Sequence, residues 1–398
     1  MRTVGIVGLG YVGLPLAVHF ADRGFRVIAF DTDDAKVVSL KECRSYIEDV
    51  TDDQLKSVVT RICPTTDPSL LSTADCVSVC VPTPVKGILP DLEPIMGALE
   101  SIADHVKPGA VVVIESTVYP NFTKEKAAPL FPNSEVVFSP ERVDPCNTKY
   151  SIKDIPKVLG ADSPSALEKA RHFYSEVFTL HEVHSTSVAE VSKLLENTYR
   201  AVNIALINEV RDICADLEIN VWDVIEAADS KPFGFQAFKP SLGVGGHCIP
   251  VDPYYLLSKG NSSFIQSAMD INRHSVMRCL NIVRDKLKGN VLLLGMAYKP
   301  NVSDCRESPS LHLLRDLQTI EESGQFAIGF FDPYVAQVNS DKGLLNGFSS
   351  LKEALEWADC ALVCVNHDVF DKSMILESGA LVFDFCGMFR GKYGISGL

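Results

Sequence analysis

The sequence predicts an α/β protein in which two doubly wound parallel sheets are joined by a helical middle domain. Three observations lead to this fold class. Short apolar segments alternate with helix-like segments at both ends of the chain, residues 165–231 contain neither Gly nor Pro, and the C-terminal segments repeat the N-terminal pattern. Short apolar strands alternating with helices are typical of a parallel sheet covered on both faces. We expect domains at residues 1–185, 186–286 and 287–398.

The first sheet is expected from four apolar strands near the N-terminus. A strand over residues 3–8 precedes a helix over residues 11–23, which begins at a cluster of glycines. Further strands are predicted over residues 26–31, 76–81 and 110–115, each an apolar run of the length usual for a buried strand. These strands should lie side by side in one parallel sheet.

The middle of the chain is expected to be helical. Apolar side chains recur at helical spacing through residues 187–217, at Val188, Val191, Leu194, Leu195, Ala201, Val202, Leu206, Val210 and Ile213. The pattern predicts one helix of about thirty residues, at ~3.6 residues per turn, and a helical pattern continues to about residue 286. Long central helices often carry dimer contacts, so we expect a homodimer.

The C-terminal part repeats the elements of the N-terminal part. Residues 290–295 match the first strand, and residues 327–332 match the second strand with its terminal Asp. Residues 358–365 parallel residues 74–81, including a Cys-x-x-x-Cys spacing in each. These cysteines occupy equivalent inward positions of a strand, and no Cys-x-x-Cys pair occurs, so we expect no metal site.

Composition limits the classes of partner. The 398 residues carry a net charge of −14, and 46% are hydrophobic and 22% charged, as in an ordinary globular protein. The charge gives no positive field for nucleic acid or an anionic membrane. No apolar run approaches the ~18 residues of a membrane span, and the first strand begins without a signal peptide. We expect a cytoplasmic protein.

A dinucleotide site is predicted at the end of the first strand. Gly8, Gly10 and Gly13 fit G-x-G-x-x-G, with Tyr11 and Val12 between them. The three glycines permit a tight turn, backbone approach to a pyrophosphate, and close packing of helix on strand. Asp31 ends the second strand 18 residues after Gly13, close to the ~20 expected for the acidic residue that binds the ribose. A carboxylate there repels a 2′-phosphate, which favours NAD over NADP.

The second sheet lacks this glycine pattern. Lys299 and Arg306 follow its first strand where a dinucleotide site would have glycines. These cations could hold a nucleotide diphosphate from a substrate, or they could be two solvated surface charges. Their charge pattern alone leaves both interpretations open.

A single cysteine in a Gly-rich loop indicates covalent chemistry. Cys248 follows Gly245, Gly246 and His247 and stands four residues before Asp252. A thiolate is a good nucleophile, and exposed loop N–H groups help to lower a thiol pKa. Together with a nicotinamide site, the cysteine suggests oxidation past the aldehyde to a carboxylate.

The long helix carries polar residues that could assist this chemistry. Lys193 and Asn197 stand at i and i+4 on one face, and Asn208 lies about three turns further along it. A Lys and an Asn aimed together can hold an oxyanion that develops as a hydride leaves. A solvated polar stripe is the alternative interpretation of the same residues.

Seven motifs, in order, resemble those of the UDP-glucose/GDP-mannose dehydrogenase family across essentially the full length. They are Gly8–Pro15, Val81–Pro84, Glu115–Val118, Ser139–Arg142, Lys193–Asn197, Gly243–Asp252, and Tyr298-Lys299 with Arg306–Pro309. The resemblance implies that Cys248 holds the sugar C6 as a thiohemiacetal and then a thioester. It implies a four-electron oxidation with two NAD⁺ per UDP-sugar.

The same resemblance assigns roles to individual residues. The implied catalytic residues are Cys248, Lys193, Asn197, Asp252, Glu141 and Thr117. The implied NAD-binding residues are Gly8, Gly10, Tyr11, Val12, Gly13, Asp31, Pro82, Thr83, Thr117 and Arg306. The implied substrate-binding residues are Glu141, Arg142, Lys193, Asn197, Phe235, Phe238, Lys239, Gly245, Tyr255 and Lys299.

The loop around Cys248 looks more like the family branch that oxidises UDP-N-acetylhexosamines than like the UDP-glucose branch. Three loops depart from the branch pattern, at Ser241-Leu242, at Asn121-Phe122 and at Asp144–Asn147. They shape the sugar pocket, so they leave the C2 and C4 configuration of the hexosamine open. Adjacent residues of an extended loop point apart, so we expect His247 to shape the pocket and not to act as the base for Cys248.

Three other functions remain as alternatives. The first is a UDP-glucose 6-dehydrogenase, and the second is a two-electron hydroxy-acid dehydrogenase, which would need a lysine but no cysteine. The third is a non-catalytic NAD-binding protein, against which the joint presence of Lys193, Asn197 and Cys248 argues.

Overall fold

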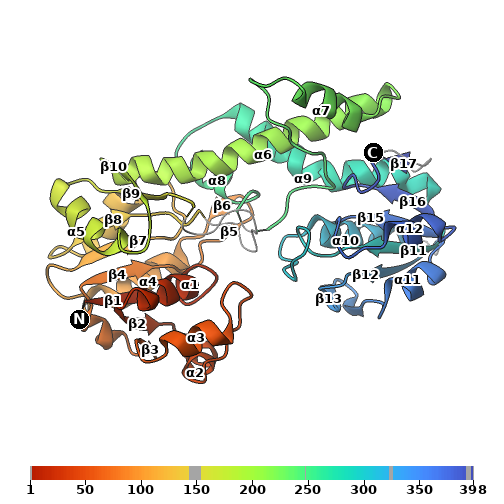
Figure 1. Cartoon of the computed structure of the whole chain (residues 1–398). Coiled ribbons are helices and arrows are strands. Elements are labelled where there is room, and N and C mark those ends of the chain that lie inside the picture. The colour runs from red at the N-terminus through yellow and green to blue at the C-terminus, as the bar shows by residue number, and fades with distance from the viewer. Residues whose placement is uncertain (1, 143–153, 247, 322–325, 391–395, 398) are drawn as a thin grey trace. The chain divides into compact units, whose positions relative to one another are not determined.

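A computed structural model describes residues 2–142, 154–246, 248–321, 326–390 and 396–397 (Figure 1). The departing loop at Asp144–Asn147 and His247, for which a role was predicted, lie outside these residues. The chain divides into two compact units. Unit 1 comprises residues 1–196 and 254–261, and unit 2 comprises residues 197–253 and 262–398.

Unit 1 is built on an eight-stranded sheet with the order β10-β9-β8-β7-β4-β1-β2-β3. All neighbouring strands pair in parallel except β8 and β9, which are antiparallel. Its strands are β1 (Thr3–Val7), β2 (Arg26–Phe30), β3 (Ile62–Thr65), β4 (Cys76–Val79), β7 (Val111–Ile114), β8 (Glu135–Phe138), β9 (Lys157–Gly160) and β10 (Leu180–Val183). A short hairpin, β5 (Val85–Lys86) and β6 (Leu89–Pro90), follows β4.

Helices between the strands of unit 1 bury their apolar faces against this sheet. They are α1 (Gly13–Asp22), α2 (Asp34–Lys41), α3 (Asp52–Val58), α4 (Glu93–Ala103) and α5 (Pro164–Tyr174), with the short 3₁₀ helices η1 (Pro68–Thr73) and η3 (Ala128–Leu130) and the π-helical segment η2 (Thr123–Ala127). One cluster of buried apolar side chains joins β1 and β2 to α1, α2, α3 and α5. This core fixes the carboxyl ends of the strands, where ligands of such folds bind.

Unit 2 contains a five-stranded parallel sheet with the order β12-β11-β15-β16-β17. The strands are β11 (Gly289–Leu294), β12 (Phe326–Phe331), β15 (Cys360–Val363), β16 (Leu381–Asp384) and β17 (Ser396–Gly397), beside a hairpin of β13 (Gln337–Ser340) and β14 (Gly343–Asn346). The helices are α7 (Val221–Asp229), α9 (Ser263–Val283), η4 (Arg284–Lys286), α10 (Pro309–Glu321), α11 (Leu351–Trp357) and α12 (Lys372–Glu377).

Two helices contribute residues to both units. The longer is α6 (Thr186–Asp216), with 31 residues, and the shorter is α8 (Asp252–Leu257). The predicted helix over residues 187–217 therefore lies within one residue of α6 at each end. The helical pattern predicted to about residue 286 is interrupted between α7 and α8, where Pro232, Gly234 and Pro240 cannot continue a helix.

The predicted α/β fold with two sheets is confirmed, although the first sheet has one antiparallel pair, β8 with β9. In each sheet the first strand pairs on one side with the second, as β1 with β2 and β11 with β12. On its other side it pairs with the strand that carries the cysteines, β4 or β15. Within the described ranges, no helix has both the length and the apolar character needed to cross a membrane.

Candidate active site

The glycine-rich turn between β1 and α1 has the geometry of a nucleotide loop. Gly8 adopts φ +87°, and a Cβ on Gly13 would lie 1.8 Å from the carbonyl oxygen of Gly8, so neither position accepts a side chain. A Cβ on Gly10, in contrast, would meet nothing within 4 Å. Gly10 thus leaves open space at the start of α1, and no side chain caps that helix at Val12. This arrangement fits a pyrophosphate bound by helix N–H groups.

Asp31 lies directly after β2, and its carboxylate is bound to the same turn. Oδ2 accepts a hydrogen bond of 2.7 Å from Leu9 N, and Lys36 Nζ lies 3.1 Å from that oxygen. Oδ1 accepts a hydrogen bond of 3.0 Å from Asp33 N. Asp31 therefore stands at the edge of the nucleotide loop, where the sequence predicts the ribose-binding residue.

The loops after β4 and β7 are joined at the same edge of the sheet. Ser116 Oγ donates to the carbonyl oxygen of Val81 at 2.7 Å, beside the exposed Pro82 and the buried Thr83. Thr117, next in the chain, is half-buried. Pro82, Thr83 and Thr117, which are predicted to bind NAD, thus lie in loops that follow two neighbouring strands.

The departure at Asn121 has a backbone explanation. Asn121 adopts φ +73°, in the left-handed region that favours Gly and that Asn tolerates better than most residues. The buried Glu190 of α6 accepts hydrogen bonds from Asn121 N (2.6 Å) and Thr123 N (2.8 Å). The turn after Thr117 is therefore held by a carboxylate.

Glu141 lies three residues beyond β8 and is bound by a buried lysine. Lys157 Nζ lies 2.9 Å from Glu141 Oε2 and 2.5 Å from Glu115 Oε2. Glu141 Oε1 accepts a hydrogen bond of 2.7 Å from Arg142 N. The carboxylate is thus oriented through both oxygens, and its side chain is 20% exposed.

Arg142 is engaged by α6. Its guanidinium pairs with Glu196, with 2.8 Å between NH2 and Oε1, and NH1 donates to the carbonyl oxygen of Pro156 at 2.6 Å. The ion pair with Glu196 shows that this guanidinium already contacts one carboxylate. The substrate contact expected of Arg142 stays a prediction.

The loop that carries Cys248 is tied to a buried amide and carboxylate in unit 2. Asn197 Nδ2 donates to Asp252 Oδ2 at 2.6 Å, and both residues are buried. Asp252 N in turn donates to the carbonyl oxygen of Cys248 at 2.9 Å. Cys248 is exposed, and Lys193 stands one turn before Asn197 on α6. The exposed thiol therefore lies on a backbone turn that a buried polar pair fixes.

The start of the same loop is held by a second polar cluster of α6. Asn208 Oδ1 accepts a hydrogen bond of 2.9 Å from Ser241 N, and Arg211 NH1 donates to the carbonyl oxygen of Ser241 at 2.9 Å. Asn208 and Arg211 are almost fully buried. Asn208 is therefore a support of the cysteine loop, in place of the solvated stripe that remained open from the sequence.

The glycines before Cys248 pack against the loop that follows β11. A Cβ on Gly245 would lie 2.8 Å from the carbonyl oxygen of Glu307, and Gly246, at φ +77°, lies against the ring of Tyr298. Gly246 N donates to the carbonyl oxygen of Arg306 at 3.2 Å. The Arg306 side chain is 56% exposed and forms an ion pair of 2.7 Å with Asp304. Lys299, half-buried, lies with Nζ 5.7 Å from the centre of the Tyr298 ring.

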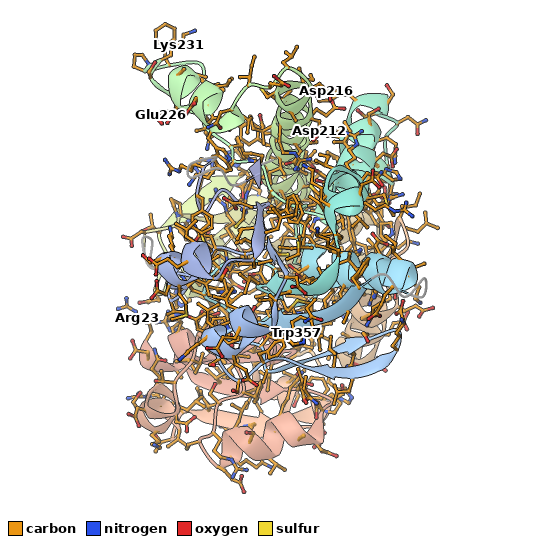
Figure 2. The ribbon with its side chains drawn as sticks, turned by 90° about the vertical axis from the view of Figure 1, so that its right-hand side faces the viewer. Arg23, Asp212, Asp216, Glu226, Lys231 and Trp357 are labelled. Atoms are coloured by element: carbon orange, nitrogen blue, oxygen red, sulfur yellow. The ribbon has the colours of Figure 1, made fainter. Side chains whose placement is uncertain are left out.

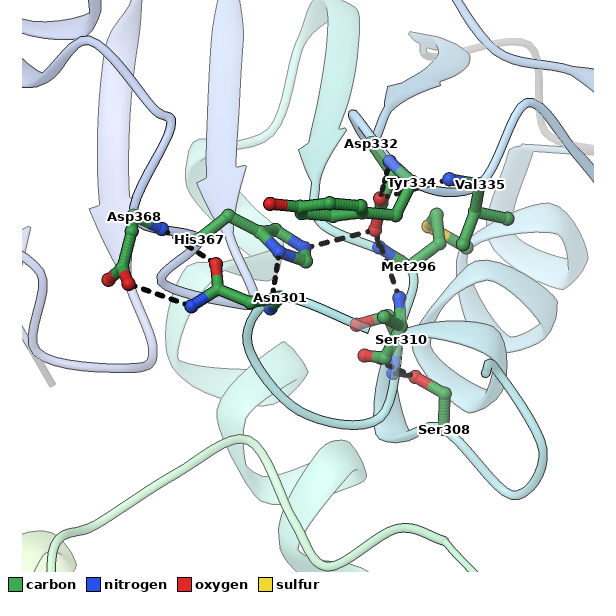
Figure 3. A network of polar contacts seen from close by, with 10 residues as sticks. Met296, Asn301, Ser308, Ser310, Asp332, Tyr334, Val335, His367 and Asp368 are labelled. Atoms are coloured by element: carbon green, nitrogen blue, oxygen red, sulfur yellow. Dashed lines mark hydrogen bonds and ion pairs between the residues drawn. The ribbon is translucent and has the colours of Figure 1, made fainter. Parts of the chain in front are cut away.

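The loop that follows β11 is anchored by Asp332, which comes directly after β12 (Figure 3). Asp332 Oδ2 accepts from Met296 N (2.6 Å) and Ala297 N (3.0 Å), and the buried His367 lies with Nε2 3.1 Å from it. Asn301 N donates to His367 Nδ1 at 3.0 Å, so Nε2 carries the proton that His367 donates. Asp332 occupies the position that Asp31 has in unit 1, and it fixes the turn that leads to Lys299.

The remaining predicted substrate residues are less uniform in their surroundings. Phe235 and Lys239 are exposed, and Phe238 is partly buried against the cluster of α7. All three residues come after α7 in the chain. Figure 2 labels Asp212 and Asp216 near the end of α6, Glu226 in α7, and Lys231 just after α7. Tyr255 is fully buried in unit 1, and its hydroxyl donates to the carbonyl oxygen of Pro84 at 3.1 Å. The substrate contact of Tyr255 stays a prediction.

The sequence did not predict the role of Lys157, a buried residue at the carboxyl edge of the unit 1 sheet. It begins the apolar run Lys157–Gly160, where a lysine reads as a strand end in solvent. Its two partners are 42 and 16 residues away in the chain. A carboxylate directly after a fully apolar strand, as Glu115 is after β7, was the available signal for a buried ion pair.

Three family models match the chain in sequence order. The NAD binding domain of the UDP-glucose/GDP-mannose dehydrogenase family matches residues 2–178, its central domain residues 187–274, and its UDP binding domain residues 292–391. The chain belongs to this family. The family is one of NAD-dependent dehydrogenases, so the chain is an enzyme and its cofactor is NAD, which the loop at Gly8–Gly13 fits.

Relatives in this family resemble the chain along most of its length. A UDP-N-acetyl-D-mannosamine dehydrogenase of Methanococcus maripaludis is 32% identical over 93% of this chain and 87% of its own. A UDP-N-acetyl-D-glucosamine 6-dehydrogenase of Pseudomonas aeruginosa is 34% identical over 84% and 83%. The solved structure of a UDP-D-ManNAc dehydrogenase from Pyrococcus horikoshii aligns with a TM-score of 0.87 and 28% identity, over 100% of this chain and 99% of its own.

Proposed function

We propose that the protein oxidises the C6 hydroxyl of a UDP-N-acetylhexosamine to the uronic acid through a covalent intermediate on Cys248. The observation that carries the proposal is the exposed thiol of Cys248 on a turn that Asp252 and Asn197 fix. A nucleophile needs access to substrate together with a defined backbone position. The buried Asn197–Asp252 pair supplies the position, and exposure supplies the access.

The first oxidation requires a proton to leave the C6 hydroxyl. We assign its removal to Lys193, Asn197 and Asp252 acting with water. Asn197 is buried, and its amide, bound to Asp252, is oriented for one further hydrogen bond to an oxyanion. Lys193 is 9% exposed, so a positive charge there acts in surroundings of low polarity, where it stabilises an alkoxide more than it would in water.

The Cys248 thiolate then adds to the C6 aldehyde, and the thiohemiacetal becomes a thioester in the second oxidation. Gly8, Gly10, Gly13 and Asp31 would hold NAD⁺, which would accept the hydride of each oxidation. Pro82, Thr83, Thr117 and Arg306 complete the proposed cofactor contacts. Water then hydrolyses the thioester, with Glu141 as the proton acceptor and Thr117 as a water-positioning residue.

The substrate class follows from the relatives and from the cysteine loop. The relatives' names identify UDP-N-acetylmannosamine and UDP-N-acetylglucosamine as their substrates. We assign the UDP contacts to Lys299, Lys239, Gly245, Phe235, Phe238 and Tyr255, and the other substrate contacts to Glu141, Arg142, Lys193 and Asn197. The test is NADH release with UDP-glucose, UDP-GlcNAc, UDP-GalNAc, UDP-ManNAc and GDP-mannose. We expect the N-acetylhexosamines to rank first, and a clear preference for UDP-glucose would contradict the assignment.

We also propose that the enzyme is a cytoplasmic homodimer with domains at residues 1–185, 186–286 and 287–398. Large apolar side chains lie exposed along α6, at Val188, Val191, Leu195, Tyr199, Leu206 and Ile213. Exposed apolar rows of this length mark interaction surfaces. Sedimentation equilibrium should give twice the mass of the chain, and Leu195→Asp with Leu206→Asp should give the monomer.

A further inference from the structure

A buried lysine links two carboxylates at the carboxyl edge of the unit 1 sheet. Lys157 Nζ lies 2.5 Å from Glu115 Oε2 and 2.9 Å from Glu141 Oε2. The side chains of Lys157 and Glu115 are 3% and 0% exposed, whereas that of Glu141 is 20% exposed. The cluster therefore has a sealed inner carboxylate, a sealed ammonium group, and an outer carboxylate that water can reach.

The antiparallel pairing of β8 and β9 explains why these residues meet. Phe138 pairs with Gly160, and continuing that register by three residues sets Glu141 opposite Lys157. Glu115 follows β7, which pairs with β8 on the other side. Lys157 thus receives one carboxylate from each of two adjacent strands.

The inner end of the cluster is fully hydrogen-bonded. Tyr174 of α5 lies with its hydroxyl 2.5 Å from Glu115 Oε1, and Ser78 Oγ lies 2.8 Å from the same hydroxyl. Buried ion pairs contribute little net stability, because desolvation of the charges offsets their attraction. Stability therefore does not account for a lysine at this position, and its effect on Glu141 is the remaining role.

We propose that Lys157 is a positioning residue that keeps Glu141 ionised and oriented while Glu141 activates water against the Cys248 thioester. This inference rests on the proposed function. In the step, the water oxygen bonds to the thioester carbon, the water proton passes to Glu141, and the carbon–sulfur bond breaks to release the Cys248 thiolate. No electrons are transferred. Only an ionised Glu141 can accept the proton.

Two cysteines and a tyrosine near the cluster stay neutral, and the two buried charges of the cluster act on each other. Burial raises the pKa values of Cys80 and Tyr174, and of Cys76, which also face the cluster from β4 and α5, so these groups stay neutral. Burial opposes the charge of Lys157, but Glu115 and Glu141 outweigh it and raise its pKa. Burial raises the pKa of Glu115, against the opposing effect of Lys157. Arg142, the next residue in the chain after Glu141, pairs with Glu196.

Two variants should move the pH dependence of hydrolysis in opposite directions. Glu115→Gln leaves Glu141 as the only carboxylate on Lys157, so the acid limb of thioester hydrolysis should move to lower pH. Lys157→Met with Glu115→Gln removes the cation and its inner partner together, so no buried charge is left uncompensated. The acid limb should then move to higher pH, because the cation that is removed contacts Glu141 directly, whereas Glu115 contacts Lys157 on its other side.

The measurement is a single turnover of the full-length enzyme with UDP-N-acetylhexosamine and NAD⁺ from pH 5.5 to 9, quenched in acid. Intact-mass spectrometry follows the Cys248 adduct. On the acid limb we expect the double variant to form the adduct and to hydrolyse it more slowly than the parent at the same pH, with recovery at higher pH. Lys157→Arg keeps the cation, so it should hydrolyse the adduct like the parent. The control is Lys124→Met, which replaces an exposed lysine of the same unit and should also behave like the parent.

The outcomes separate this inference from the function on which it rests. A folded double variant with the hydrolysis rate and pH profile of the parent, beside a slow Glu141→Gln, would overturn the inference alone. Normal hydrolysis by Glu141→Gln would overturn the role of Glu141 and the inference with it. If the double variant does not fold, Glu115→Gln decides the question, because a shift to higher pH there contradicts the inference.

Discussion

Asn197 Nδ2 donates a hydrogen bond of 2.6 Å to Asp252 Oδ2, and this contact joins α6 to the turn that begins at Cys248. Both side chains are buried, so each depends on the other and not on bulk solvent for this hydrogen bond. An unpaired buried acceptor costs more free energy than an exposed one. The contact therefore links the position of the nucleophile to the helix that carries Lys193.

Replacement of Asn197 by Ala should lower kcat more than it raises KM. Asp252 would lose its donor, and the oxyanion contact would be lost, so we expect kcat to fall by about tenfold to a hundredfold, equivalent to ~1.5–3 kcal/mol. Steady-state kinetics with UDP-N-acetylhexosamine measure both constants. Asn203→Ala on the same helix, whose amide donates to the carbonyl oxygen of Tyr199, is the matched control. An unchanged kcat in Asn197→Ala would contradict the assigned role.

Asp31 and Lys36 together predict how cofactor choice changes. Asp31→Ala should weaken NAD binding by ~1.5–3 kcal/mol, because a charged hydrogen-bond acceptor for the ribose is lost. It should also relax discrimination against NADP, since Lys36, now 3.1 Å from Asp31, becomes available to a 2′-phosphate. Binding of UDP-sugar should stay unchanged.

The test for this pair is NAD and NADP titration of three variants. Asp31→Ala with Lys36→Ala should bind NADP more weakly than Asp31→Ala alone. Asp34→Ala, an exposed neighbour in the first turn of α2, should bind both cofactors like the parent. A loss of UDP-sugar affinity in Asp31→Ala would contradict one nucleotide per sheet.

Lys299 predicts the reverse dependence. Lys299→Ala should raise KM for UDP-sugar by about tenfold to a hundredfold, because a cation–phosphate contact worth ~1.5–3 kcal/mol is lost. NAD affinity should not change. Lys288→Ala, an exposed lysine before β11, is the control. Weaker NAD binding in Lys299→Ala, with KM for UDP-sugar unchanged, would contradict the assignment of Lys299 to the UDP-sugar site.

Asp332 predicts a pH-dependent contribution to stability. Burial opposes ionisation of Asp332, but donors from His367, Tyr334 and Met296 outweigh burial and hold its pKa below the usual value. A carboxyl with a lowered pKa stabilises the fold above its unfolded pKa of ~3.9 and loses that contribution as pH falls through the folded pKa. Asp332→Asn should therefore be less stable at pH 7 by about 1–3 kcal/mol. The difference should shrink below about pH 4.

Urea unfolding at pH 7, 5 and 3.5 measures this difference. Asp341→Asn is the control, because its side chain is 73% exposed and its ion pair with Arg315 is long, at 3.6 Å. Its stability should stay within about 0.5 kcal/mol of the parent. A gap between Asp332→Asn and the parent that is the same at all three pH values would contradict the sign derived for Asp332.

Local patterns in the sequence were sufficient for α6 and for part of each sheet, including β1, β2, β4 and β7, but not for β3, β8, β9, β10 or β16. The strand predicted over residues 26–31 is β2 (Arg26–Phe30), and the helix predicted over residues 187–217 is α6 (Thr186–Asp216). Apolar periodicity is a property of neighbouring residues, so it can be read without the fold. The glycine spacing at Gly8 and Gly13 is local in the same sense.

Contacts that depend on strand register could not be read in this way. The pairing of Lys157 with Glu141 follows from one antiparallel step, between β8 and β9, in a sheet whose other neighbours are parallel. The support of Ser241 by Asn208 spans 33 residues, and that of Met296 by Asp332 spans 36. Polar residues of this kind read as surface positions until packing buries them.

The stoichiometry of oxidation tests the central claim most directly. With limiting UDP-N-acetylhexosamine, we expect two NADH and one uronate per sugar, and no free aldehyde. Cys248→Ser should bind NAD like the parent and make uronate at least ~10³-fold more slowly, because it lacks the nucleophile. One NADH per sugar, or full uronate production by Cys248→Ser, would contradict a four-electron oxidation through a Cys248 thioester.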